Sequence, residues 1–135
     1  LHPPENVAKM AAGQALNDED RAGWLTTLAG VLAQARAADQ GLVISCSALK
    51  RSYRDRLRAA CPGLRFVFLE IAPQEAQARV QARASHFFSA SLVDSQFATL
   101  ESPVGEEGVL RVDATAPMDQ LQCQVSDWLQ SGVRT

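Results

Sequence analysis

Basic side chains gather where an apolar run of the sequence ends. The stretch VISCSALKRSYRDRLR (43–58) starts with β-branched and other apolar residues, and five of the chain's 13 Lys and Arg residues follow within nine positions. A helix would bring four of them into an arc of about 100°: Lys50, Arg51, Arg54 and Arg58. Such a group, next to helix N-terminal amides, can bind a carboxylate or a phosphate. The alternative interpretation is a solvated helix face.

A second basic group follows in AQARVQARASHFF (76–88). Arg79 and Arg83 are four residues apart and so share one face of a helix, with His86 just beyond. Arginine pairs of this kind can close over phosphate oxygens, because phosphoryl transfer depends on charge stabilisation and positioning. The alternatives are again a solvated face and a structural histidine. Neither histidine has the neighbours that a metal site requires, so no metal site is predicted.

The overall composition gives no sign of a polyanionic partner. Lys and Arg number 13 against 15 Asp and Glu, which leaves a formal net charge of −2 and a pI near 5.6. We therefore expect neither nucleic acid nor a membrane surface as a partner. The three cysteines are far apart and form no CxxC pair. No apolar run approaches the roughly 20 residues that span a bilayer, so a cytoplasmic protein is expected.

Apolar periodicity predicts an α/β fold in one domain, residues 1–135. Three apolar runs have the composition of strands: 42–46, 65–71 and 109–115. The intervening segments read as helices: 4–12, a long helix that starts after Asn17 or Asp18 and stops by Gly41, and the segments near 50–60, 74–84, 91–100 and 117–130. Alternating strands and helices are typical of a parallel sheet whose crossovers cover its faces.

Four longer stretches carry a resemblance to a known family. They are LHPPENVAKMAAGQALNDEDRAGWL, CSALKRSYRDRLR, ARASHFFSASLVDSQFATLESP and VLRVDATAP. In this order and spacing the chain resembles the gluconokinases of the small P-loop kinase group, which are related to shikimate kinase. The match runs from Leu1 to about Gln130, and its long patterns are far more specific than any single short motif.

This resemblance implies a reaction and its reactants. It implies ATP-dependent phosphorylation of the 6-hydroxyl of D-gluconate to 6-phosphogluconate, with Mg²⁺ bridging the nucleotide phosphates. The implied fold is a doubly wound parallel sheet of the P-loop kinase type with a mobile helical lid, here at roughly 76–100. A homodimer is plausible by the same resemblance.

The resemblance also assigns roles to individual residues. Arg21 resembles the arginine that grips the substrate carboxylate, and Lys50 and Arg54 would hold the acid or its hydroxyls. Arg79 and Arg83 resemble lid arginines that close on the phosphates and, with Lys50, take part in catalysis. The remaining assignments are His2, His86 and Gln96 on the substrate side and, beside Arg79 on the nucleotide side, Asp113, Ala114, Thr115 and Pro117.

The sequence departs from the family pattern in its phosphate loop. None of the glycines begins a GxxxxGK[ST] loop, and the family's acidic DGD-like turn is missing too. We therefore expect this chain to lack the first βαβ unit, to be an incomplete form, and by itself to fold poorly and show no kinase activity. Two alternatives stay open: a related kinase for another sugar acid or polyol, and a non-catalytic remnant that binds gluconate or dimerises.

Overall fold

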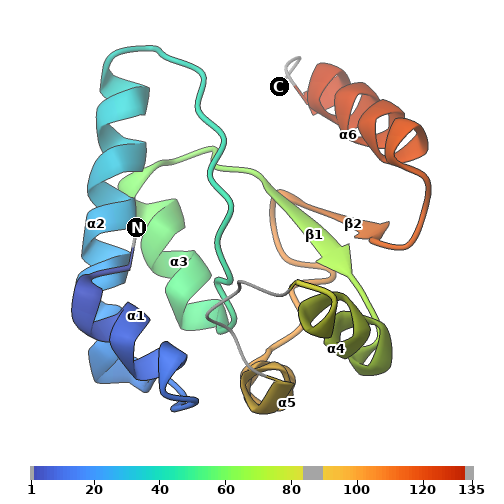
Figure 1. Cartoon of the computed structure of the whole chain (residues 1–135). Coiled ribbons are helices and arrows are strands. Elements are labelled where there is room, and N and C mark those ends of the chain that lie inside the picture. The colour runs from blue at the N-terminus through green and yellow to red at the C-terminus, as the bar shows by residue number, and fades with distance from the viewer. Residues whose placement is uncertain (1, 84–89, 133–135) are drawn as a thin grey trace. The chain divides into compact units, whose positions relative to one another are not determined.

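Six helices and two strands are formed by the residues that the computed structural model describes, 2–83 and 90–132 (Figure 1). In chain order they are α1 (Pro4–Ala11), α2 (Asp18–Ala37), α3 (Arg51–Ala60), β1 (Phe66–Glu70), α4 (Pro73–Gln81), α5 (Ala90–Thr99), β2 (Val109–Asp113) and α6 (Met118–Gly132). The fold is therefore mixed α/β with a small parallel sheet. The predicted site residue His86 lies outside the described residues.

The chain divides into two compact units. The larger unit comprises Leu1–Leu64 and Pro73–Ser102, and so contains α1, α2, α3, α4 and α5. The smaller unit comprises Arg65–Ala72 and Pro103–Thr135, with β1, β2 and α6. Each unit is described by itself below.

Helix α2 has a strong local start signal. The Asn17 side chain accepts from the Asp20 amide at 2.8 Å, and the Asp20 carboxylate accepts from the Asn17 amide at 2.9 Å, which completes a capping box. Three acids in the first turn also suit the positive end of the helix dipole. The N-terminus of α2 is thus fixed in position, and the site described below begins there.

The larger unit has its core between α2 and α3, which lie side by side in Figure 1. Leu28 and Leu57 are each only 1% exposed, and Trp24 is 3% exposed. The other buried apolar residues of this unit are Met10, Leu25, Leu32, Ala48, Leu49, Tyr53, Leu92 and Val93. The buried residues of α2, Trp24, Leu25, Leu28 and Leu32, follow the spacing of an amphipathic helix, whereas Ala48 and Leu49 lie in the connection before α3.

The smaller unit is built on a two-stranded parallel sheet. Strands β1 and β2 pair in register from Phe66 opposite Val109 to Glu70 opposite Asp113. Helix α6 packs against β2, and the Arg65 guanidinium lies 5.8 Å from the centre of the Trp128 ring. Parallel pairing of β1 and β2 confirms the prediction of parallel strands at 65–71 and 109–115.

The predicted strand at 42–46 is wrong. Within the described residues this segment has no regular secondary structure, and Val43 is 95% exposed. A strand is stabilised by the ladder of hydrogen bonds to a neighbour, and β1 and β2 pair only with each other in the sheet that the described residues form. An apolar β-branched run therefore stays an extended connection here. The doubly wound sheet stays a prediction.

The helix predicted at 74–84 is shorter than expected. Helix α4 ends at Gln81, and the Arg83 amide bonds to the Val80 carbonyl at 3.1 Å, in the i to i−3 pattern of a tightened last turn. Arg79 is inside the helix and Arg83 lies just beyond it. The other predicted helices are confirmed to within a few residues at their ends.

Candidate functional site

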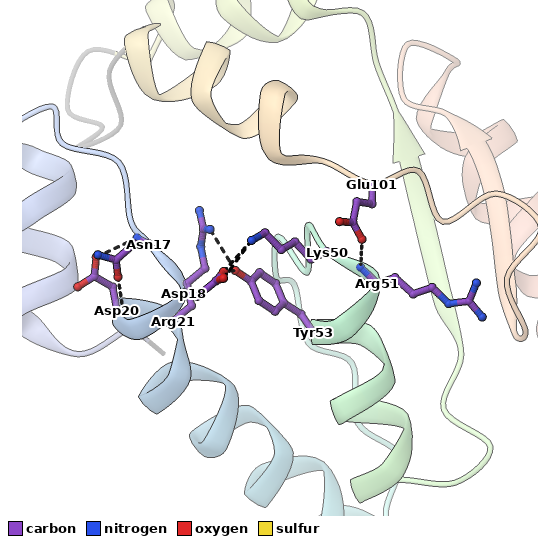
Figure 2. Close-up of polar contacts among 8 residues, drawn as sticks. All are labelled: Asn17, Asp18, Asp20, Arg21, Lys50, Arg51, Tyr53 and Glu101. Carbon is purple, nitrogen blue, oxygen red and sulfur yellow. Dashed lines mark hydrogen bonds and ion pairs between the residues drawn. The ribbon is translucent and has the colours of Figure 1, made fainter.

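Three side chains gather around the carboxylate of Asp18 where α2 and α3 begin, as Figure 2 shows. Lys50 Nζ donates to both oxygens of Asp18, at 2.9 and 3.1 Å. The Tyr53 hydroxyl also donates to Asp18 and accepts from Arg21 Nη1 at 3.3 Å. We call these four residues, Asp18, Arg21, Lys50 and Tyr53, the carboxylate cluster.

Local structure explains why the carboxylate cluster forms. Asp18 is the first residue of α2 and Arg21 follows three positions later, so both lie on one side of the first turn. Lys50 is the N-cap of α3 and Tyr53 lies in its first turn. Because α2 packs against α3, the two helix starts bring residues that are more than 30 positions apart into contact.

The electrostatics of the cluster stabilise the ionised carboxylate of Asp18. The hydrogen bond from Tyr53, followed by that from Lys50, holds the pKa of the Asp18 carboxyl below its usual value. Conversely, the bond to Asp18 raises the pKa of the Lys50 amine. Arg21 and Lys50 each lie 5.7 Å from the centre of the Tyr53 ring, within the range of a cation–π contact.

The two cations of the cluster differ in accessibility. Arg21 is only 5% exposed, whereas the Lys50 side chain retains 31% and the Asp18 side chain 67% of its accessible surface. A ligand can therefore reach Lys50 from solvent while Arg21 supplies charge from beneath. The arrangement can hold a carboxylate between a lysine, an arginine and a phenol, with charge-assisted hydrogen bonds.

His2 lies at the start of the same unit and stacks on Trp24. The ring centroids are 4.6 Å apart at an interplanar angle of 14°. Burial lowers the pKa of His2, and the charge of Arg21 adds to that effect. The buried Asn6 amide lies 3.3 Å from His2 Nδ1 and donates to the Asp20 carbonyl at 2.8 Å. A neutral imidazole of this kind can exchange hydrogen bonds with hydroxyl groups.

Arg54 does not lie on an exposed basic stripe, contrary to the helical-wheel expectation. It is 2% exposed. Its Nη1 donates to the carbonyls of Ala48 and Leu49 at 2.8 and 3.0 Å, and its Nη2 donates to the Glu101 carbonyl at 2.8 Å. The guanidinium thus binds backbone inside the unit, which favours a positioning role for Arg54.

Of the predicted lid arginines, Arg79 lies on α4 and Arg83 just beyond it, whereas the predicted substrate-side residue Gln96 lies on α5. Arg79 and Arg83 are both exposed, and Gln96 of α5 is half-buried. Helices α4 and α5 pack together, and Gln77 of α4 is hydrogen-bonded to Asp94 of α5. The exposed arginines are in a position to meet a ligand from solvent.

The predicted adenine-side residues follow β2 in the smaller unit. Asp113 ends the strand, and its Oδ1 accepts from the Thr115 amide at 2.9 Å and from the Thr115 hydroxyl at 2.7 Å. Ala114 is half-buried and Pro117 is exposed. These two bonds form a tight Asx-type turn.

Three contributors to these contacts were missed in the sequence. Asp18 and Tyr53 complete the carboxylate cluster, and Glu101 accepts a hydrogen bond from the Arg51 amide at 2.8 Å (Figure 2). Asp18 could have been found as an acid in a capped first turn and Tyr53 as a polar aromatic beside Lys50. Glu101 is 50 positions from its partner, and no local signal points to it.

The described residues offer neither a metal-binding cluster nor a membrane-spanning helix. Residues 2–83 and 90–132 contain no group of three or more His, Cys, Asp or Glu that could hold a metal ion. No helix in the same residues has both the length and the apolar character that crossing a membrane requires.

Comparisons with known proteins point to one family. No family model matches the chain. It is 48% identical over 112 residues to a gluconokinase of Gluconobacter oxydans, an alignment covering 83% of this chain and 63% of that protein's length. It is 37% identical over 133 residues to the thermoresistant gluconokinase of Escherichia coli, covering 98% of this chain and 76% of that protein.

Solved structures of a sugar kinase and a gluconokinase are also similar to this chain. A sugar kinase from Janibacter sp. superposes with a TM-score of 0.89 at 40% identity, covering 96% of this chain and 75% of that one. A gluconokinase from Sinorhizobium meliloti superposes with a TM-score of 0.78, also at 40% identity, covering 97% of this chain and 78% of that one.

Proposed function

Because the chain belongs to the gluconokinase family, we propose that it serves the ATP-dependent phosphorylation of D-gluconate to 6-phosphogluconate. One observation carries the proposal for these residues: Lys50 and Tyr53 both donate to a carboxylate, that of Asp18, and the buried Arg21 donates to the same Tyr53 hydroxyl. A sugar acid carries such a group at one end and a free hydroxyl at the other. The carboxylate cluster would hold the acid end.

In the proposed reaction, the oxygen of the 6-hydroxyl attacks the γ-phosphorus of ATP. The new oxygen–phosphorus bond forms as the bond to the β,γ-bridging oxygen breaks, ADP leaves, and the hydroxyl gives its proton to a base. We assign Arg21 and Lys50 to the acid, and His2, His86 and Gln96 to its hydroxyls. Arg79 and Arg83 would compensate charge on the phosphate oxygens, which is the main demand of phosphoryl transfer.

ATP and Mg²⁺ enter this proposal as the substrate MgATP. The turn with Asp113, Ala114, Thr115 and Pro117 would receive the adenine through backbone groups. Within the described residues no carboxylate or histidine group is suited to hold a metal by itself, so no protein ligand to Mg²⁺ is assigned. The 135 residues also contain no GxxxxGK[ST] loop, and we propose that turnover requires such a loop together with the residues named here.

A coupled assay of ADP release tests the function. We expect the full-length gene product to release ADP with D-gluconate and to form 6-phosphogluconate, identified by mass spectrometry. D-glucose, which lacks the carboxylate, should be a poor acceptor, because Lys50 and Arg21 would then face no anion.

Other outcomes would separate the alternatives. Faster turnover with shikimate or another sugar acid would indicate a related kinase. Gluconate binding without any ATP-dependent product would indicate a non-catalytic binding protein. A polypeptide of these 135 residues alone should show no turnover, and clear ATP-dependent product from it would contradict the need for a separate phosphate loop.

A further inference from the structure

Glu101 joins the segment that follows α5 to the N-terminus of α3. Its carboxylate accepts from the Arg51 amide at 2.8 Å, and its own amide donates to the Leu49 carbonyl at 2.8 Å (Figure 2). Lys50, the N-cap of α3, makes no side-chain capping hydrogen bond of its own. Glu101 therefore supplies from a distance the acceptor and the negative charge that a helix start favours.

Arg54 holds the same turn from inside. Its guanidinium donates to the carbonyls of Ala48, Leu49 and Glu101. One planar group therefore joins the segment before α3 to the segment after α5. Ala48 has a φ of +34°, a left-handed conformation that costs a non-glycine residue free energy. Such a conformation persists where the surrounding structure determines it strongly, and it is often found near functional sites.

The turn at residues 48–50 positions the side chain of Lys50. This residue directly follows Ala48 and Leu49, both buried, and its carbonyl accepts from the amides of Tyr53 and Arg54 at 3.1 and 3.2 Å. With the backbone fixed on both sides, the Lys50 side chain points from the helix start to Asp18.

We propose that Glu101 and Arg54 are positioning residues that hold the turn at 48–50, so that Lys50 stays in the carboxylate cluster. The effect on catalysis rests on the proposed function, since Lys50 is the group assigned to the sugar acid. The positioning itself does not.

The first test measures Lys50 directly, without any substrate. These 135 residues contain two lysines, Lys9 and Lys50, so acylation of Lys50 relative to Lys9 can be read by peptide mass spectrometry. In the full-length protein, Glu101→Ala should release Lys50 from Asp18 and raise this ratio about threefold or more. The bond to Asp18 raises the pKa of the Lys50 amine, so losing that bond leaves more unprotonated amine to react. Glu101→Gln keeps an oxygen acceptor and should give the wild-type ratio.

A second variant removes the same hydrogen bond at its donor, the Arg51 amide. Arg51→Pro deletes the amide that Glu101 binds, at a first helical position that tolerates proline. The preceding Lys50, at φ −100° and ψ 148°, already has the extended backbone that a following proline demands. Arg51→Ala keeps the amide and is the matched control. Glu5→Ala, which removes an exposed first-turn acid from α1, is a second control.

The second test uses gluconate and a double-mutant cycle. Glu101→Ala should raise the KM for gluconate about threefold to tenfold, with the KM for ATP unchanged, and this effect should vanish in a Lys50→Met background. An unchanged acylation ratio in folded Glu101→Ala and Arg51→Pro proteins would overturn the proposal, as would an equal KM penalty with and without Lys50. If acylation responds but no gluconate is phosphorylated, the positioning holds and the proposed function fails.

Discussion

The buried guanidinium of Arg54 provides the sharpest test of the structure. Arg54→Met keeps an apolar chain of similar reach and removes every donor. Three backbone carbonyls then lose a charge-assisted hydrogen bond, although Leu49 keeps the bond from the Glu101 amide. A buried acceptor that loses its partner costs about 1–3 kcal/mol. The carbonyls of Ala48 and Glu101 both lose their partner, and the variant no longer buries a charge, which offsets part of that cost. We therefore expect the free energy of unfolding to fall by about 2–4 kcal/mol.

Urea denaturation of the full-length protein measures this loss. With a slope of about 2 kcal/mol per molar urea, the midpoint should fall by about 1–2 M. Arg54→Lys should lie between the wild type and Arg54→Met, because an ammonium cannot span the separated carbonyls as a planar fork does. The matched control is Arg51→Met on the same helix, whose exposed pair with Asp55 at 3.7 Å should matter by less than about 1 kcal/mol. Equal losses in Arg54→Met and Arg51→Met would refute the reasoning.

Three further predictions concern the carboxylate cluster, its helix cap and the proposed lid. Asn17→Ala should destabilise the protein by about 1 kcal/mol in urea denaturation, because the capping box loses its acceptor for the Asp20 amide. The pKa of Asp18 is depressed in the folded state, so its ionised carboxylate stabilises the protein above the unfolded-state pKa, and this stabilisation is lost as the pH falls through the folded-state pKa. Asp18→Asn should therefore make the free energy of unfolding fall less steeply toward acid pH. An unaltered acid limb would contradict this. In steady-state kinetics, Arg21→Ala should raise the KM for gluconate about tenfold or more, whereas Arg83→Ala should mainly lower kcat, and the reverse pattern would exchange their roles.

Much of the helical structure could be read from the sequence because its determinants are local. Asn17, the acids after it and the apolar spacing from Trp24 onward lie on one continuous segment, and the structure has α2 from Asp18 to Ala37. The parallel strands 65–71 and 109–115 were likewise predictable from composition. In the described residues these two strands pair with each other along their whole length.

The errors arose where the deciding partner is distant in the sequence. The apolar run at 42–46 has strand composition, but a ladder requires a neighbour that composition cannot supply. Arg54 has the spacing of a solvated stripe, yet its guanidinium is only 2% exposed because carbonyls from residues 48, 49 and 101 surround it. No periodicity argument could have placed Glu101 at the start of α3.

The charges of the carboxylate cluster explain how Asp18 and a substrate could share one site. Arg21 and Lys50 carry two positive charges and Asp18 carries one negative charge, so these four residues retain one positive charge for an incoming carboxylate. The hydrogen bond to Asp18 raises the pKa of the Lys50 amine and holds its side chain at the start of α2. The Asp18 side chain is 67% exposed and can turn toward water without unpacking the core. Asp18 would therefore hold Lys50 in position for an incoming acid, and the buried Arg21 would supply a second positive charge to that site.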